Sequence, residues 1–189
     1  MKGIISASSF RNIGRKKRKK YKPKKKINRL KKTEHFHRHK QKIPSIILSK
    51  VDDKEIIYGA RALNKRFPSF LDRHTEDYDI FSTHPKKDAR EAERALDKAF
   101  GGDFFAVKKA LHPGTFKIIA HANKQGYADY TKPDKMIPFD RIGGKKYVKL
   151  DYVKKTIRKT LADPESKYRH DKDRDALERI LIYEKLKKR

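Results

Sequence analysis

Three aspartates have the residue type and the spacing of a metal-dependent phosphoryl-transfer site. Asp77 and Asp79 stand one residue apart in "EDYDIFS", at the start of a strand-like run. Side chains i and i+2 of a strand project from one face, so these carboxylates would lie side by side and repel each other. A bound cation relieves that repulsion, and Mg²⁺ takes oxygen ligands while keeping positions for phosphate. The alternative is a turn or a solvated strand end, which alone would also explain an Asp-x-Asp pair.

A third aspartate, Asp129, lies 50 residues further on in the strand-like run "GYADYT". If the two strands are neighbours in one sheet, three carboxylates meet. Such a set can hold two metal ions for in-line phosphoryl transfer, with one ion lowering the pKa of the attacking hydroxyl and the other neutralising a triphosphate.

A glycine turn precedes the aspartates and supplies a candidate phosphate contact. In "YGARALN", Gly59 stands where a strand meets a helix, and a glycine there allows phosphate to approach the backbone. Asn64 would fix the loop or touch the sugar, while Lys117 and Lys172 could reach a triphosphate. Lysines on strands and helices are otherwise solvated surface groups. The candidate nucleotide- and phosphate-binding residues are Gly59, Ala60, Asn64, Lys117 and Lys172.

The elements that must position these residues alternate between strands and helices. The runs 55–60 and 78–82 are predicted strands, and "RALNKRF" between them is a short helix that ends at Pro68. Residues 85–100 give the clearest helix, with Pro85 at its first position, an apolar stripe at helical spacing and two glycines after it.

The second half continues with strands and ends in helices. Residues 103–122 read as a hairpin turning at His112-Pro113-Gly114, followed by a strand over 126–131. Residues 150–161 and the segment from Pro164 to the C-terminus are predicted helices. The order indicates an α/β (α+β) fold, a small mixed β-sheet packed with helices. We expect an arm over residues 1–43, a core over 44–148 and C-terminal helices over 149–189.

Positive charge dominates the composition and is concentrated near the N-terminus. The chain carries 52 Lys and Arg against 24 Asp and Glu, and residues 1–42 hold 18 of these bases with a single acid, Glu34. Like-charge repulsion predicts that residues 1–43 are disordered until they meet a polyanion. The residues expected to contact nucleic acid are Arg15, Lys16, Lys17, Arg18, Lys19, Lys20, Lys24, Lys25 and Lys26. A solubilising tail or a targeting segment is the alternative.

Cysteine content and hydropathy limit the cross-links, metal sites and membrane segments that the chain can have. The chain has no cysteine, which excludes disulfides and Cys-ligated zinc. No apolar run approaches the roughly 20 residues that span a bilayer, so we expect no membrane association.

Taken together, "YGARALN", "EDYDIFS", "ALHPGTFKI" and "YADYTKP" resemble the nucleotidyltransferase superfamily, and within it the catalytic subunits of poly(A) polymerases from poxviruses and other large DNA viruses. The similarity covers about residues 55–140, with a weaker match in "YRHDKDRDAL". Ala60 departs from it, since the family has Gly or Ser there. The resemblance implies a polymerase-β-like nucleotidyltransferase core, Mg²⁺ or Mn²⁺, metal-ligand roles for Asp77, Asp79 and Asp129, and a phosphate-loop role for Gly59.

The expected function is metal-dependent transfer of a nucleoside monophosphate from NTP, with ATP favoured, to the 3′ end of a nucleic acid, with RNA favoured over DNA. The alternative is a catalytically inactive nucleic-acid-binding, packaging or ribonucleoprotein component that uses the same fold. The family's full-length polymerases are much longer, so a protein partner could supply further domains. We expect a cytoplasmic location (a viral factory or virion if the protein is viral), or a nuclear one if the arm is a targeting signal.

Overall fold

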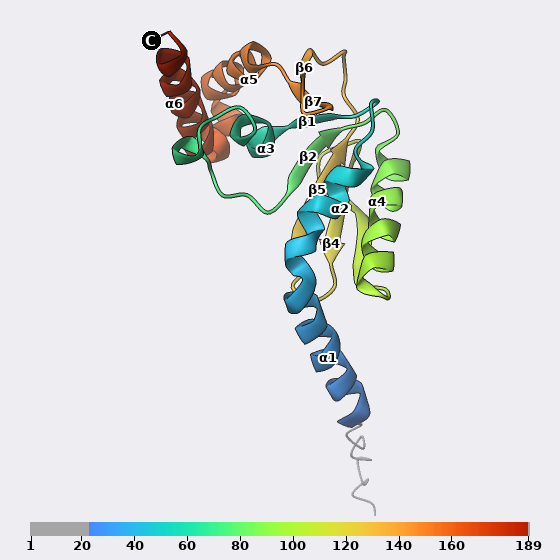
Figure 1. The fold of residues 1–189 in the computed structure, drawn as a ribbon. Helices are drawn as coiled ribbons and strands as arrows, with labels where there is room; N and C mark the ends of the chain where they lie inside the picture. Colours follow the sequence, from blue (N-terminus) through green and yellow to red (C-terminus); the bar gives the residue numbers. More distant parts are fainter. Residues whose placement is uncertain (1–22, 189) are drawn as a thin grey trace, which may run out of the picture.

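A seven-stranded mixed sheet lies at the centre of the molecule (Figure 1). The computed structural model describes residues 23–188. The strand order is β3-β4-β5-β2-β1-β7-β6; β2 runs parallel to β5 and β1 parallel to β7, while the other neighbours are antiparallel. The strands are β1 Ile56–Tyr58, β2 Tyr78–Phe81, β3 Phe105–Lys109, β4 Thr115–Ala120, β5 Gly126–Thr131, β6 Phe139–Ile142 and β7 Lys145–Val148.

Helices cover the two faces of this sheet unequally. Helices α2 and α4 lie against the face of the β3-β4-β5 half, whereas α3, α5 and α6 gather at the β1 end (Figure 1). The α-helices are α1 Pro23–His39, α2 Ile43–Lys50, α3 Gly59–Asn64, α4 Pro85–Phe100, α5 Leu150–Ala162 and α6 His170–Lys187, with short 3-10 turns at Lys40–Lys42, Ser69–Leu71 and Pro164–Arg169. The mixed α/β fold predicted from the sequence is confirmed.

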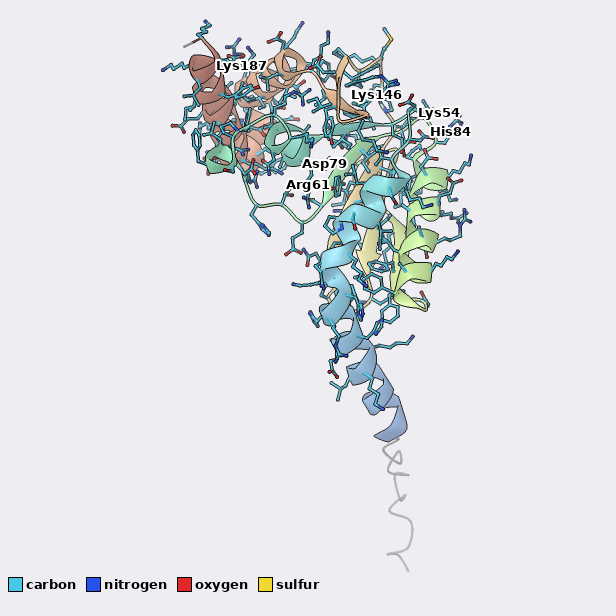
Figure 2. All side chains as sticks on the ribbon, viewed as in Figure 1. Lys54, Arg61, Asp79, His84, Lys146 and Lys187 are labelled. Atoms are coloured by element: carbon cyan, nitrogen blue, oxygen red, sulfur yellow. The ribbon has the colours of Figure 1, made fainter. Side chains whose placement is uncertain are left out.

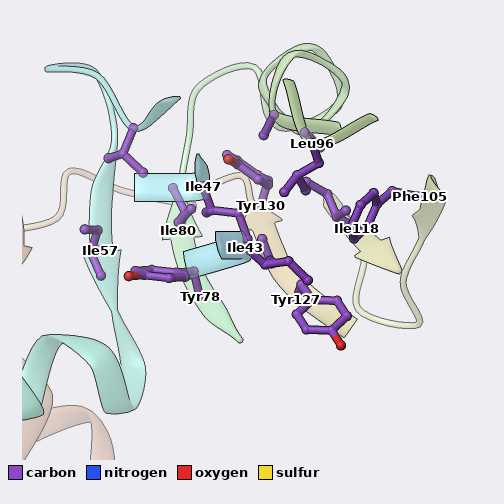
Figure 3. Close-up of a cluster of buried hydrophobic side chains, with 14 of the residues drawn as sticks. Ile43, Ile47, Ile57, Tyr78, Ile80, Leu96, Phe105, Ile118, Tyr127 and Tyr130 are labelled. Carbon is purple, nitrogen blue, oxygen red and sulfur yellow. The ribbon is translucent and has the colours of Figure 1, made fainter. Parts of the chain in front are cut away.

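Alternation along the central strands separates an apolar face from a polar one. In β2, Tyr78 and Ile80 are buried, and in β5 Tyr130 is buried beside Ala128. These side chains pack with Ile43 and Ile47 of α2 and with Leu96 of α4 (Figure 3). Because successive side chains of a strand point to opposite faces, the residues between them must face the other side of the sheet.

Helix α4 has the predicted bounds, and its ends follow the expected chemistry. Pro85 occupies the first turn, where a missing N–H costs no hydrogen bond. Gly101 follows in the left-handed conformation, with φ of 73°. Ala89, Ala92, Leu96 and Phe100 of its apolar stripe are buried, whereas Ala99 is exposed, and this burial explains how a helix with so many charged residues is held on the sheet.

A smaller apolar cluster joins the C-terminal helices to the loop after α3. It consists of Leu63, Phe67, Leu71, Ile157, Ala176 and Ile180. Arg179 of α6 reaches into it and donates a hydrogen bond to the Leu71 carbonyl at 2.9 Å, while its guanidinium lies 5.9 Å from the Phe67 ring. These contacts hold α6 beside the segment that leads into β2.

Two strands were not predicted. Strands β6 and β7 form a hairpin around Gly143 and Gly144, both with positive φ, and β7 extends the sheet beside β1. A two-residue Gly-Gly turn between short runs is a hairpin signal. Exposed, highly polar side chains in β6 conceal the alternation that would have marked the strand.

The predicted arm ends earlier than expected. Its residues 1–22, including the basic run from Arg15 to Lys20, lie outside the described residues. Helix α1 begins at Pro23, and the predicted disorder is wrong for residues 30–43, which are helical and in part buried. Phe36 is completely buried, with ring centroids of Phe100 and Phe105 at 5.9 and 6.0 Å. Burial of Phe36, Ile43 and Ile47 outweighs the charge repulsion in this segment, which contains Lys24, Lys25 and Lys26.

Replacing Phe36 by alanine should therefore destabilise the whole domain. We expect a loss of about 3–5 kcal/mol in the free energy of unfolding, because the substitution leaves a cavity beside the rings of Phe100 and Phe105. Leu30 of the same helix is 60% exposed, so Leu30→Ala should change stability by less than about 0.5 kcal/mol. Urea denaturation of both variants measures the difference, and equal midpoints would contradict the docking of α1.

Candidate active site

Asp79 and Asp129 lie directly opposite each other on neighbouring strands. They form a register pair in the parallel ladder between β2 and β5, and both point away from the apolar face that contains Ile80 and Tyr130. Asp77 immediately precedes β2. The strand adjacency that the sequence argument required is thus present, and it brings together two carboxylates that are 50 residues apart in the chain.

Gly59 is packed against Asp79 so closely that only glycine fits. Its φ is +66°, a region that side chains with a Cβ rarely adopt. A Cβ at this position would also lie 2.9 Å from Cγ of Asp79 and closer still to its Oδ2. The glycine turn and the carboxylate therefore share one small space at the start of α3.

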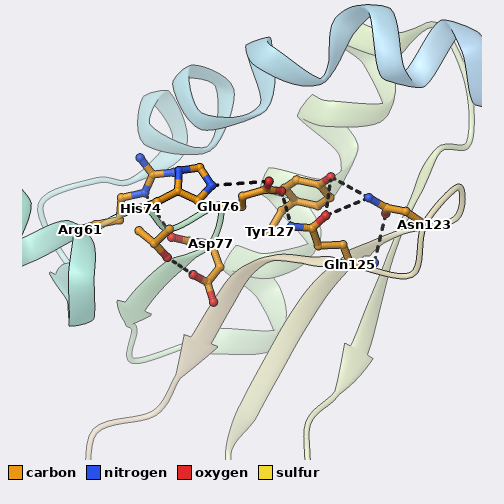
Figure 4. A network of polar contacts seen from close by, with 8 residues as sticks. Arg61, His74, Glu76, Asp77, Asn123, Gln125 and Tyr127 are labelled. Carbon is orange, nitrogen blue, oxygen red and sulfur yellow. Dashed lines mark hydrogen bonds and ion pairs between the residues drawn. The ribbon is translucent and has the colours of Figure 1, made fainter. Parts of the chain in front are cut away.

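Contacts on either side hold Asp77 in place. Thr75 donates a short hydrogen bond to Oδ1 of Asp77, and Nε of Arg61 donates to its carbonyl at 3.3 Å. The Arg61 guanidinium also lies 4.5 Å from the centre of the Tyr78 ring. Figures 2 and 4 show Arg61 beside this segment.

A polar network connects the approach to β2 with the turn between β4 and β5 (Figure 4). Glu76 accepts a short hydrogen bond from Gln125, and Asn123 donates to Oε1 of Gln125 at 2.9 Å and to the Tyr127 hydroxyl at 3.1 Å. His74 lies 3.8 Å from Glu76 on the other side. The network fixes the backbone on which Asp77 and Asp79 stand relative to the strand that carries Asp129.

Burial and mutual repulsion make the carboxylates hard to ionise. Burial raises the pKa of Asp79 to about 6, the charges of Asp77 and Asp129 add to the rise, and Lys172 and Arg169 oppose it. Burial also raises the pKa of Asp129, against the effect of Lys117, with Asp77 again adding to the rise. A cation among these oxygens would remove both the desolvation penalty and the repulsion.

The Asp129 carboxylate is only half satisfied. Its Oδ2 lies 3.3 Å from Nζ of Lys117, whereas its Oδ1 is buried without a hydrogen-bond partner in the part of the chain that the structure describes. An orphaned buried carboxylate oxygen suits a cation. In the present arrangement, no cluster of three or more His, Asp or Glu within residues 23–188 forms a ready metal-binding group.

A cavity of about 680 Å³ opens over the carboxylates, between the sheet and the C-terminal helices. Its wall includes Gly59, Asp79 and Asp129 from the sheet side, and Tyr152, Arg169 and Lys172 from the helical side. Lys172 therefore faces the same space as Asp79 and Asp129, whereas Asp77 is not part of the cavity wall. The cavity is large enough for a small-molecule ligand of nucleotide size.

Other predicted residues lie elsewhere among those that the structure describes. Asn64 uses its amide to donate to the Arg73 carbonyl at 2.7 Å and to accept from the Arg73 N–H at 3.1 Å, so it braces a loop and does not line the cavity. Ala60 in α3 and Lys117 in β4 are likewise absent from the cavity wall.

Sequence reasoning missed a cluster of hydroxyl groups beside the carboxylates. The Tyr58 hydroxyl lies 3.1 Å from Oγ1 of Thr131, which is 3.1 Å from Oγ1 of Thr115, and all three residues line the cavity. The Tyr58 ring stacks on Phe81 with centroids 3.9 Å apart. Thr131 stands two residues after Asp129, so strand alternation contained the signal that both face the same side.

Comparison with known proteins identifies the fold. No family model and no curated protein matches the sequence. The solved structures similar to the chain include the crystal structure of the Megavirus polyadenylate synthase, with a TM-score of 0.63 and 21% sequence identity. The match covers 96% of this chain and 40% of that one, so the chain spans about two fifths of the length of the synthase. The fold is poly(A)-polymerase-like.

Gly59→Ala should be far more harmful than the same change at Gly101. Both glycines have positive φ, but a Cβ at Gly101 meets nothing within 4 Å. We expect Gly101→Ala to lower the free energy of unfolding by about 1 kcal/mol and Gly59→Ala to lower it by about 2–4 kcal/mol. The larger loss at Gly59 arises because the new Cβ would overlap Asp79 in addition to straining the backbone. Adding Asp79→Ala should recover most of the excess cost in a double-mutant cycle measured by urea denaturation. Additive losses would contradict the proposed contact.

The raised pKa of Asp79 predicts a specific pH dependence of stability. In the folded protein Asp79 keeps its proton up to about pH 6, whereas an aspartate in the unfolded chain loses its proton near pH 4. The free energy of unfolding therefore falls as the pH rises from about 4 to about 6. Asp79→Asn should remove this decline and gain about 2–3 kcal/mol over wild type between pH 4 and pH 7. Urea denaturation in chelator across this range measures the difference, and a flat difference profile would contradict the prediction.

Glu55, which immediately precedes β1, provides a comparison from outside the site. Burial raises its pKa to about 7, so Glu55→Gln should remove a decline that extends to higher pH than the one removed by Asp79→Asn.

Proposed function

We propose that the chain is a metal-dependent nucleotidyltransferase that transfers a nucleoside monophosphate from NTP, with ATP as the favoured donor, to the 3′ end of RNA. The observation that supports this most strongly is the register pairing of Asp79 with Asp129, which directs two carboxylates into one cavity beside the Gly59 turn. Such grouping is costly for folding and is explained by a ligand that compensates for it.

In this proposal, Asp77, Asp79 and Asp129 would hold Mg²⁺ or Mn²⁺, which supplies charge neutralisation and lowers the pKa of the attacking hydroxyl. The free Oδ1 of Asp129 would accept a hydrogen bond from the 3′ hydroxyl of the acceptor. Arg169 and Lys172 would pair with the triphosphate across the cavity. The glycine turn would let phosphate oxygens approach the backbone, since no Cβ stands there.

The partners follow from the fold likeness and the charge. The similar solved structure is named a polyadenylate synthase, which favours ATP and RNA as substrates. The basic residues near the N-terminus would retain the acceptor strand. We also propose that this domain works together with further enzyme domains, since it matches about two fifths of that synthase. Within residues 23–188, no helix combines the length and the apolarity needed to cross a bilayer.

Two features favour the second candidate, a nucleic-acid-binding protein without catalysis. The Lys117 ammonium lies 3.3 Å from Asp129 and supplies part of the charge compensation that a metal would give. Ala60 also lacks the hydroxyl that a serine would bring to the phosphate turn. In a domain without catalytic activity, Lys117 would stabilise Asp129 in the absence of metal, and Ala60 would weaken the phosphate contact.

Extension of a labelled oligoribonucleotide separates the two candidates. With Mg²⁺ or Mn²⁺ and each NTP in turn, wild type should extend the 3′ end, and Asp79→Asn or Asp129→Asn should reduce the rate at least about a hundred-fold. Asp171→Asn is the matched control, because its carboxylate is fully exposed on α6, and it should keep the wild-type rate.

Metal binding gives a readout that does not need turnover. Mn²⁺ should raise the melting temperature of wild type and of Asp171→Asn, but not of Asp79→Asn or Asp129→Asn. Absence of extension with every NTP, together with a metal-independent melting temperature, would refute the enzyme and leave the binding protein.

A further inference from the structure

A row of cross-strand neighbours extends from the carboxylates toward the free edge of the sheet. Asp79 pairs with Asp129, Asp129 pairs with Lys117 of β4, and Lys117 pairs with Lys108 of β3. Directly paired residues of adjacent strands project from the same face. Two lysines therefore continue the line of the two aspartates on one surface.

This part of the face has no helical cover among the described residues. Helix α4 packs on the opposite side of β3, β4 and β5, and α5 and α6 lie at the other end of the sheet, beyond β1 (Figure 1). Phe105 and Phe116 belong to the apolar core, which places the alternating residues Lys108 and Lys117 on the uncovered side. Lys108 is exposed, and 40% of the Lys117 side chain is exposed.

The paired lysines are a cost to folding that a ligand would remove. Like charges directly opposite each other in a sheet are destabilising, and Asp129 provides the only carboxylate within 4 Å of either ammonium in the described chain. Gly126 makes room for the Lys117 stem, because a Cβ there would lie 3.2 Å from its Cδ. The stem is thus held flat along the sheet, with its ammonium at the edge of the site.

The position of the pair relative to the cavity indicates which substrate it meets. Gly59, Arg169 and Lys172 line the cavity, which also reaches Thr115 at one end of β4, whereas Lys108 and Lys117 are not part of its wall and continue the row from Asp129 toward the β3 edge. In-line phosphoryl transfer requires the attacking hydroxyl to enter opposite the leaving diphosphate. With the triphosphate on the cavity side, the acceptor must approach across β3 and β4.

We propose that Lys108 and Lys117 bind the phosphodiester backbone of the single-stranded acceptor next to its 3′ end. This inference rests on the proposed function for the identity of the strand as acceptor. Lys117 exchanges its ion pair with Asp129 for a phosphate when the strand arrives, which frees the carboxylate for the terminal hydroxyl. The role differs from the triphosphate contact that the sequence suggested for Lys117.

Salt-dependent binding of the full chain to a fluorescent oligoribonucleotide, without NTP, tests the lysine pair. The double variant K108Q/K117Q should lower the slope of log K against log[salt] by about 1.4 and weaken binding roughly tenfold at 0.1 M salt, as expected for two lost phosphate contacts. K98Q/K109Q removes the same charge from the opposite side of the sheet, where Lys109 pairs with Phe116, and should leave the slope unchanged. Equal losses in the two double variants would overturn the proposal.

Photocross-linking tests the path of the strand. An oligoribonucleotide with a photoreactive nucleotide at its 3′ end should cross-link to β3 and β4 in wild type and in K98Q/K109Q, and at least fivefold less in K108Q/K117Q. Cross-links confined to α5, α6 or α1 would overturn the inference even if extension is observed. Cross-links to β3 and β4 with no extension and a metal-independent melting temperature would refute the nucleotidyltransferase and retain this surface as the binding site for single-stranded RNA.

Discussion

The burial of Asp79 and Asp129 side by side, with Asp77 close by, is the constraint on which the site depends. Parallel pairing of β2 and β5 forces the two carboxylates together at the edge of a cavity, where burial weakens their solvation. The opposite face of the same strands provides the compensating stabilisation, since Ile80 and Tyr130 are buried beneath α2 and α4. One face of each strand thus stabilises the fold, and the other holds charge that the fold alone would not favour.

Charge around the carboxylates is arranged in two groups that act from different sides. Lys172 and Arg169 approach Asp79 from the helical wall of the cavity, and Lys117 approaches Asp129 from the neighbouring strand. Neither group neutralises the aspartates fully, because burial still raises the pKa of both. The site therefore remains receptive to a cation among the oxygens and to anions on either flank.

Strand alternation was enough to predict that Asp79 and Asp129 project from the polar face of their strands, because apolar residues alternate with acids in both runs. Helix α4 was equally predictable, since Pro85, the apolar stripe and Gly101 all indicate the same element. The β6-β7 hairpin was not predictable, because the exposed polar side chains of β6 give no apolar alternation. The packing of Phe36 on the core was not predictable either, because lysines outnumber apolar residues in α1. For Asn64 the sequence left two alternatives, and the structure shows the loop-fixing one, since its amide bonds to Arg73 only when the loop folds back.

The order of strands in the sheet also governs when the site can form. Between β2 and β5 lie α4, β3 and β4, so the parallel ladder closes only after that intervening segment has folded as a crossover. Contacts between residues so distant along the chain form slowly, because closing the loop between them costs conformational entropy before the contact contributes any favourable interaction. We therefore expect the two carboxylates to meet only when the β2–β5 ladder closes, after the local contacts of the intervening segment have formed.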